Sequence, residues 1–254
     1  PEPEPVQDAA SRHVSQLPKV DVQAGGSANW QVIWAQFKLD VRETARSRVF
    51  LILVVVGIIN LTAGLLVRSG EGFGNTTLPV TYSVVESIRG GLYLFMIAII
   101  THYCGVLVWK EREAKLDEVV DALPYPTWTT YLAKTASMMA IVFIMMIAGM
   151  IVGLGYQTFR GYTRYQFGLY GTELLLNDML QFFFLVVLAM AWHVISPNKY
   201  VGYFGFIAFL IVNAFVWFML DWSTLLASYG EVPSVIYSDF YGFAPFTTSV
   251  LWFS

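Results

Sequence analysis

Several side chains that could bind ions or carry protons occur inside apolar stretches of this sequence. Glu86 and Arg89 stand near the start of one stretch, His102 lies deeper in it, and His193 and Asn213 lie in two later ones. Such groups are costly in lipid, so they commonly pair with one another or line a path for a substrate or ion. Glu86 and Arg89 are three residues apart on an expected helix, which predicts a mutual ion pair, with a gating role as the alternative.

Hydrogen bonding is the first expectation for the other polar groups. We expect His102 to bond a neighbouring backbone group, and a place in a substrate or proton path is the alternative. His193 and Asn213 are expected to bond across helices. Gly149 and Gly153 form a GxxxG spacing that lets another helix approach closely, and this common spacing is a weak sign of a dimer seam.

No segment carries the residue pattern of a nucleotide-binding, peptidase or disulfide site. A phosphate-binding loop needs a lysine directly after a glycine, and none of the six lysines has that position. His13, His102 and His193 are far apart in sequence, so there is no H-E-x-x-H zinc motif, and Cys104 is the single cysteine. We therefore expect no enzyme activity and no catalytic, cofactor-binding or metal-binding residues here.

A densely charged segment separates two apolar stretches. Residues 108–126 read VWKEREAKLDEVVDALPYP, with eight charged residues between Lys110 and Asp121. Four apolar residues in it recur at helical spacing, namely Leu116, Val119, Val120 and Leu123. We predict an amphipathic helix over residues 110–124, ended by the two prolines that begin at Pro124. Such a helix is suited to docking a soluble partner, and a solvated hairpin tip is the alternative.

Composition and apolar runs predict an all-α membrane protein. The 254 residues are 56% hydrophobic and 13% charged, with a mean hydropathy of +0.58, whereas a soluble domain is about 25% charged. Five stretches approach the ~20 residues that cross the hydrocarbon core. They cover about residues 49–67, 85–109, 131–156, 175–196 and 200–220. Residues 49–254 are therefore expected to form a polytopic helical bundle, in which residues 243–254 could begin a sixth span.

The N-terminal part differs in composition from the rest. Residues 1–28 are rich in Pro, Glu, Gly and Ser, which predicts a flexible linker. Residues 29–48 have an amphipathic pattern, with Trp30, Ile33, Trp34, Phe37 and Val41 on one face and Lys38, Asp40, Arg42 and Glu43 facing away. We expect an interfacial helix, and a helix packed under the bundle is the alternative. Both chain ends are expected to be cuts in a longer polypeptide.

The 15 lysines and arginines indicate an orientation. With the N-terminus inside, eleven are cytoplasmic and four are outside, namely Arg68, Arg89, Arg160 and Arg164. Residues 110–124 are then cytoplasmic. Arg160 and Arg164 lie among tyrosines in an outer loop that could meet anionic lipid headgroups. The net charge of −3 and the scattered basic residues favour no nucleic-acid partner.

The charged segment resembles the coupling helix of ABC type-2 permeases. The resemblance lies in Lys110-Glu111-Arg112-Glu113, Leu116-Asp117-Glu118-Val119 and Leu123-Pro124. The family's pattern is roughly E-R-E-x-G-T-x-E-x-L-x-x-x-P, and Ala114 and Lys115 replace its usual Gly-Thr. The resemblance implies that an ATPase is coupled through Glu111, Arg112, Glu113, Leu116, Glu118, Leu123 and Pro124. Because Ala114 and Lys115 depart from the pattern, the local contact with an ATPase is expected to differ from that of the family or to be absent.

Longer segments resemble the second membrane half of bacterial permeases fused to a zinc aminopeptidase. They include WAQFKLDVRETARSRVFLILVVVGIINL, LPVTYSVVESIRGGLYLF, FRGYTRYQFGLYG and NKYVGYFGF. In that family a permease half precedes this region and a peptidase follows it. The resemblance implies an exporter half in the bacterial inner membrane, working with a separate ATP-hydrolysing subunit and a second permease half. A non-transporting scaffold or anchor subunit of a larger assembly is the alternative.

Overall fold

The structure, a computed structural model, describes residues 26–68, 78–116, 118, 120, 122, 125–220 and 229. These residues form helices and connecting turns without any strand, which confirms the all-α prediction for this part of the chain. Most of the expected linker and the expected start of a sixth span at residues 243–254 lie outside the described residues. So do Leu123 and Pro124 of the charged segment.

The helices are, in chain order, α1 (Gly26–Arg46), α2 (Arg48–Arg68), α3 (Thr81–Glu113), α5 (Thr127–Phe159), α6 (Phe167–Leu169), η2 (Tyr170–Asn177), α7 (Asp178–Ile195) and α8 (Lys199–Met219). α6, η2 and α7 run on without a gap, and η2 is a π-helix. Five helical segments of the described chain are long and apolar enough to cross a membrane: Arg48–Val67, Thr81–Glu113, Thr127–Phe159, Phe167–Ile195 and Lys199–Val216. This agrees with the prediction of a multi-pass membrane protein.

α3 and α5 are longer than the spans predicted for them. Each has 33 residues, which corresponds to a helix of about 50 Å. The hydrocarbon core of a bilayer is only about 30 Å thick. Lys110 to Glu113, which follow the span predicted at 85–109, are still helical, and α5 extends beyond 131–156 at both ends. The reason is that backbone hydrogen bonding does not stop where the apolar sequence stops.

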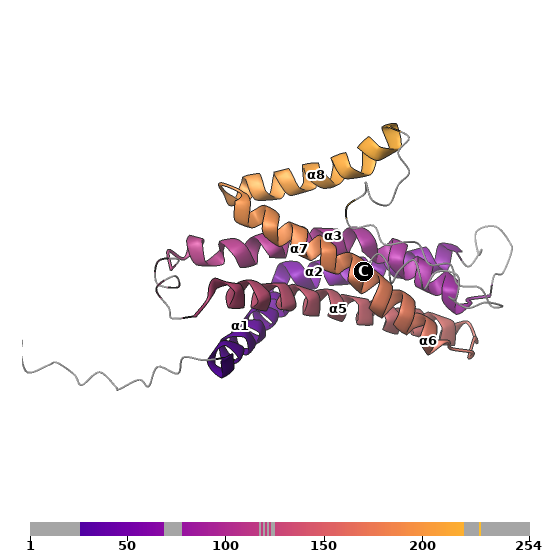
Figure 1. The fold of residues 1–254 in the computed structure, drawn as a ribbon. Coiled ribbons are helices and arrows are strands. Elements are labelled where there is room, and N and C mark those ends of the chain that lie inside the picture. Colours follow the sequence, from indigo (N-terminus) through magenta and orange to yellow (C-terminus); the bar gives the residue numbers. More distant parts are fainter. Residues whose placement is uncertain are drawn as a thin grey trace, which may run out of the picture.

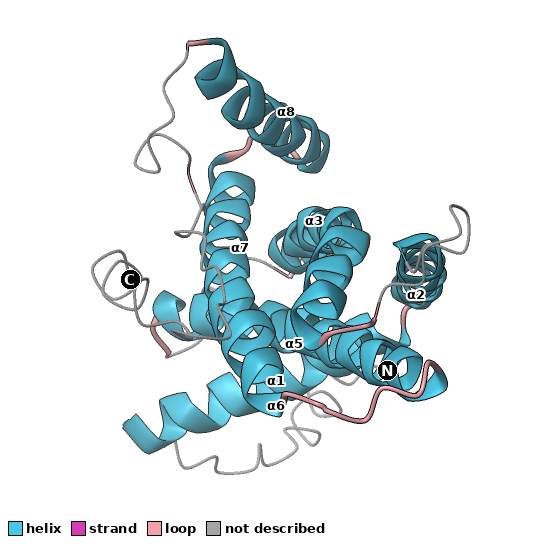
Figure 2. Ribbon diagram, turned by 90° about the vertical axis from the view of Figure 1, so that its right-hand side faces the viewer, coloured by secondary structure: helices cyan, strands magenta, loops and turns pink. Residues whose placement is uncertain are grey.

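α3 is the central helix of the bundle. α2, α5, α7 and α8 all pack against it, and its Leu92, Met96, Ile99 and Ile100 are fully buried in the apolar core. α1 lies obliquely beside the end where α3 finishes and α5 begins (Figure 1). We call this the α1 end of the bundle and the opposite one the far end. The first part of α8 packs against α3 and α7, and its later part diverges from the other helices in both views (Figures 1 and 2).

Two glycines of α5 form the seam with α3. A Cβ atom at Gly149 would lie 2.6 Å from Leu92, and one at Gly153 would lie 2.8 Å from Val84. The GxxxG spacing therefore lets two long helices of the same chain approach closely. Since α3 occupies this face, it does not serve as the dimer seam that the spacing weakly suggested.

α1 buries a different set of residues from the one expected. Its Ile33, Asp40 and Thr44 are buried, whereas Trp30 and Trp34 are 64% and 49% exposed. The prediction that Asp40 faces away from the bundle is wrong, because this side chain lies against the end of α3. The helix packs mainly against α5. Its two tryptophans lie on the outer side, where they can contact the membrane interface.

Candidate functional site

The run of four charged residues KERE forms the last turn of α3 and does not begin a separate helix. α3 ends at Glu113, and the backbone turns at Lys115, whose φ is +55°. The amide of Lys115 donates to the carbonyl of Arg112 at 3.1 Å, and the amide of Leu116 donates to that of Glu111 at 3.0 Å. This pair of hydrogen bonds is a common way for a helix to end with a left-handed residue.

Helical spacing resumes after this break. The amide of Val120 donates to the carbonyl of Leu116 at 2.9 Å, and the amide of Ala122 donates to that of Glu118 at 3.2 Å. The segment therefore differs from the single helix predicted for it, since the turn at Lys115 divides it in two. Counted from Glu111, the first acidic residue of the coupling-helix pattern, the Gly-Thr of that pattern falls on Lys115 and Leu116, and not on Ala114 and Lys115 as first aligned. Lys115 therefore has the left-handed position that glycine adopts most easily.

Lys110 connects the last turn of α3 to α1. Its Nζ lies 3.2 Å from Asp40 Oδ1 and 2.6 Å from Glu43 Oε2. The Asp40 side chain has no solvent exposure, whereas Glu43 is 61% exposed. The buried contact to Asp40 is therefore the one that fixes the position of α1, because water cannot replace Lys110 there.

The two acidic residues of the same turn connect α3 to two other helices. Glu111 lies 2.9 Å from Lys134 Nζ of α5, and Glu113 lies 2.9 Å from Lys199 Nζ of α8. One turn of α3 therefore holds α1, α5 and α8 through separate ion pairs. We call this group the charged junction, and its members are Asp40, Glu43, Lys110, Glu111, Glu113, Lys134 and Lys199.

Asp40 is the most strongly buried acid of the charged junction. Burial raises the pKa of its carboxyl above the usual value, and hydrogen bonds from Gln36 and the charge of Lys110 oppose this rise. The Gln36 amide donates to both carboxylate oxygens at 3.0 Å. Sequence periodicity could not reveal this environment, because Asp40 has the spacing of a solvent-facing residue on α1.

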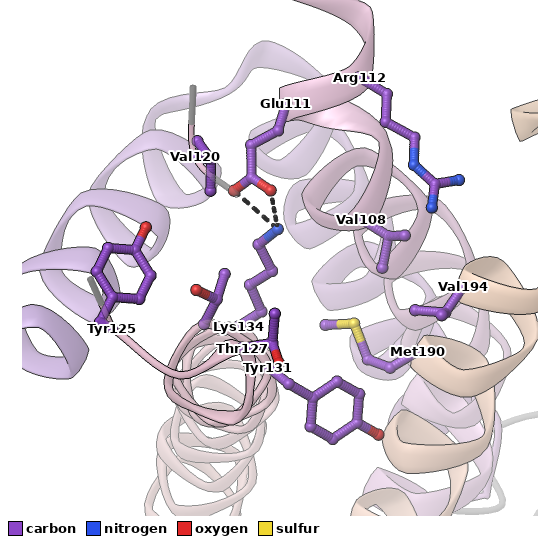
Figure 3. A pocket seen from close by; sticks show the side chains of 11 residues that line it. Val108, Glu111, Arg112, Val120, Tyr125, Thr127, Tyr131, Lys134, Met190 and Val194 are labelled. Atoms are coloured by element: carbon purple, nitrogen blue, oxygen red, sulfur yellow. Dashed lines mark hydrogen bonds and ion pairs between the residues drawn. The ribbon is translucent and has the colours of Figure 1, made fainter. Parts of the chain in front are cut away.

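A cavity of about 270 Å³ adjoins the charged junction where α3, α5 and α7 converge. Figure 3 shows the Glu111–Lys134 pair on one side and Met190 of α7 on another. Arg112 also lines this space, and its guanidinium lies 4.8 Å from the centre of the Trp109 ring. Because the space beside the ion pair is not filled by side chains, α3 and α5 can shift there with less steric resistance than in a close-packed core.

The predicted coupling residues divide into two groups. Leu116 is 50% exposed, and Glu118 beyond the break is exposed too. Glu111 and Glu113 instead contact lysines of neighbouring helices, and Arg112 lies against an aromatic ring. Exposure alone does not separate the two groups, because Arg112 and Glu113 are exposed as well. The difference is that Glu111 and Glu113 also connect helices of the same chain.

At the far end, Arg89 meets acidic residues that are distant in sequence. Its Nη2 lies 2.9 Å from Glu173 Oε2 and 2.8 Å from Asp178 Oδ1. The predicted pair with Glu86 stays a prediction, because these contacts involve other partners. Glu173 and Asp178 belong to the η2 and α7 segments, and nothing in the local sequence pattern pointed to them.

The remaining polar residues inside the spans have mainly aromatic neighbours. The His102 ring stacks on Tyr203 with 6.0 Å between centroids, and the Tyr203 hydroxyl donates to the His102 carbonyl at 3.2 Å. His193 is fully buried, and among the described residues neither of its ring nitrogens has a hydrogen-bond partner. Asn213 accepts a hydrogen bond from the Tyr229 amide at 3.3 Å. The backbone of Thr101 on α3 nevertheless acts on the His193 ring, so the interhelical bond predicted for His193 stays a prediction.

Comparison with known proteins returns no match for this chain. No family model matches it, and neither a curated protein nor a solved structure does. The contacts of the charged junction and of the far end are therefore the observations on which a function can rest.

Proposed function

We propose that the chain is a transmembrane permease subunit of an ABC-type exporter. It would lie in the bacterial inner membrane with its N-terminus in the cytoplasm, and it would pair with a second permease half and a separate ATPase. The observation that supports this proposal is the charged junction, in which three residues of one helical turn each contact a different helix. A site that receives force from outside the membrane needs such connections.

The proposed mechanism is mechanical. An ATPase that binds the segment after Lys115 and moves during its cycle would displace the end of α3. The ion pairs of Lys110, Glu111 and Glu113 would then carry this displacement to α1, α5 and α8. Because α3 also contacts α2 and α7, its tilt would change the packing of the whole bundle, as in other transitions that move packed helices as rigid bodies.

Binding and force transmission would be separate tasks of the predicted coupling residues. Leu116 and Glu118 are exposed and would contact the ATPase. Glu111 and Glu113 would transmit the motion inside the chain, since each pairs with a lysine of a neighbouring helix. This assignment modifies the expectation from the coupling-helix pattern, in which all these residues serve the same contact.

The test is purification of the chain from its native membrane, identification of the co-purifying proteins, and measurement of ATP hydrolysis by the complex. Changing Leu116→Asp together with Glu118→Lys should abolish co-purification of the ATPase. Glu111→Gln should leave the ATPase bound but uncouple its activity from the permease, because the ion pair with Lys134 is lost. The double change Glu111→Lys with Lys134→Glu should restore coupling. An ATPase lost with Glu111→Gln, or never found, contradicts the proposal.

The second candidate function is a scaffold or anchor without transport activity. The charged junction favours it to the extent that Glu111 and Glu113 contact their own chain rather than a partner. In that case other membrane proteins should co-purify with the chain, no ATPase should be among them, and Leu116→Asp with Glu118→Lys should leave the assembly intact. The same purification therefore separates the two functions.

A further inference from the structure

The ionic cluster at the far end has more negative than positive charge. Arg89 Nη2 contacts both Glu173 and Asp178, at 2.9 and 2.8 Å, so the two carboxylates share a single nitrogen atom. Arg89 Nε also donates to Asp178 Oδ1 at 2.9 Å. The acidic side chains are only 7% and 3% exposed. If both were ionised, the cluster would hold a net charge of −1 in a buried position.

The π-helical turn is the reason that both carboxylates face Arg89. Glu173 and Asp178 are five residues apart, and in an α-helix of 3.6 residues per turn they would point about 140° away from each other. In the π-helix the amide of Asp178 donates to the carbonyl of Glu173, so residues five apart lie one above the other. Single π-helical turns occur frequently at functional sites.

One carboxylate oxygen of this cluster is buried without a hydrogen bond. Asp178 Oδ2 has no partner among the described residues, and neither does the neighbouring Asn177 Oδ1. An ionised oxygen in this situation keeps the full cost of leaving water. Two carboxylates that share a site cannot both ionise cheaply, so one of them commonly holds a proton.

The surrounding helices supply no second cation to Asp178 in the described part of the chain. The charged groups that act on it are Arg89 of α3 and Glu173 of η2. α5 contributes the neutral Gln157, which accepts a hydrogen bond from Tyr170 at 3.0 Å and donates to the Pro79 carbonyl at 2.9 Å. α8 has no ionisable residue over positions 204–219. Glu86, one turn before Arg89 on α3, is exposed.

We infer that Asp178 is a proton-binding site and that the cluster of Arg89, Glu173 and Asp178 holds one proton at neutral pH. The proton comes from the aqueous phase, and it converts the Asp178 carboxylate into a carboxylic acid. The cluster then has one positive and one negative group and no net charge. This site does not depend on the proposed function.

Infrared spectroscopy of the purified chain in lipid nanodiscs tests this inference, because a carboxylic acid absorbs apart from a carboxylate. At neutral pH the wild type should show a carboxylic acid band that disappears in Asp178→Asn. The band should also disappear in Glu173→Gln, because the remaining carboxylate then has Arg89 to itself. In Arg89→Gln the band should persist, since Asp178 then has no arginine beside it. Glu113→Gln at the α1 end is the matched control and should leave the band unchanged.

Two results would overturn the inference. One is a folded Asp178→Asn variant with the same spectrum as the wild type, which would mean that Asp178 is ionised. The other is a band that stays in Glu173→Gln. This would show that the proton is not held because two carboxylates share Arg89. If a variant fails to fold, titration of the wild type alone decides, because the band must then persist at neutral pH and vanish only in alkaline solution. No ATPase takes part, so failure here would leave the exporter proposal untouched.

Discussion

At the α1 end, Glu111 and Glu113 of α3 each have their own lysine, whereas at the far end one arginine serves two buried carboxylates. The first arrangement joins helices through separate, partly exposed contacts. The second concentrates charge at one buried point. Separate contacts can break one at a time, which suits a region that must move, whereas a shared arginine couples all its partners at once.

The burial of the acids strengthens this contrast. At the α1 end only Asp40 is without exposure, and Glu43 and Glu113 are 61% and 55% exposed. At the far end both acids are nearly inaccessible. Removing the cation should therefore cost more at the far end, because exposed charges are solvated and screened when they lose a partner.

The largest expected effect is that of Arg89→Ala. It leaves Glu173 and Asp178 without a cation, and breaking a buried ion pair in this way should lower the free energy of unfolding by about 3 kcal/mol. The measurement is thermal or denaturant unfolding in detergent at neutral pH. The loss should shrink in acid, where both carboxyls are protonated, and Arg89→Lys should lose less. If Arg89→Ala lowers the free energy of unfolding by less than Lys110→Met does, removal of the cation costs more at the α1 end than at the far end, which contradicts the comparison.

Lys110→Met should have the next largest effect. It removes the lysine that lies 3.2 Å from the buried Asp40 carboxylate. The Gln36 amide still donates to both carboxylate oxygens, and losing the charged partner of a buried acid should cost about 2 kcal/mol. Glu43→Gln removes the exposed partner of the same lysine and is the control, with a much smaller expected loss. If both variants lose the same free energy of unfolding, the burial of Asp40 is not what makes its contact with Lys110 the stronger one.

The same carboxyl has a predictable pH dependence. Because burial raises the pKa of Asp40 in the folded state, the folded protein holds this proton to a higher pH than the unfolded protein does. Its contribution to stability therefore falls as the pH rises from the usual aspartate value to the raised one. The Lys110→Met variant should extend this fall towards neutral pH, and Asp40→Asn should remove it.

Lys115→Gly should make the protein slightly more stable. A side chain at a left-handed position costs roughly 1 kcal/mol, which glycine avoids. Lys115→Ala keeps the Cβ atom and is the control, with little expected change. If glycine were destabilising, the turn after α3 would not have the left-handed geometry that separates the charged junction from the exposed segment.

The smallest effect is expected for Glu113→Gln. Its pair with Lys199 is partly exposed, and such pairs contribute about 0.5 kcal/mol. Lys199→Gln should give the same small loss, and 1 M salt should remove the difference from the wild type. A loss above that of Lys110→Met would show that α8, whose later part diverges from the bundle in Figures 1 and 2, is held mainly by this ion pair and not by its packing against α3 and α7.

The spans were predictable from the sequence because each needs only local information. Uncharged runs of about 20 residues identify helices that can cross a bilayer, and five such helices are present in the described chain. The charged segment was recognisable as an interruption for the same reason. Its division at Lys115 was not, because lysine is an unusual residue at a left-handed position and its propensity indicates a continuing helix.

Local sequence by itself therefore determined which segments are helical, how many can cross a membrane, and where the charges are concentrated. Only the tertiary structure decided which charges meet. Asp40 with Lys110 and Arg89 with Glu173 and Asp178 are 70 or more residues apart, and such pairs depend on helix packing that no periodicity encodes. The π-helical turn that aligns Glu173 with Asp178 is likewise held by tertiary contacts, since an α-helix would turn one of these carboxylates away from the arginine.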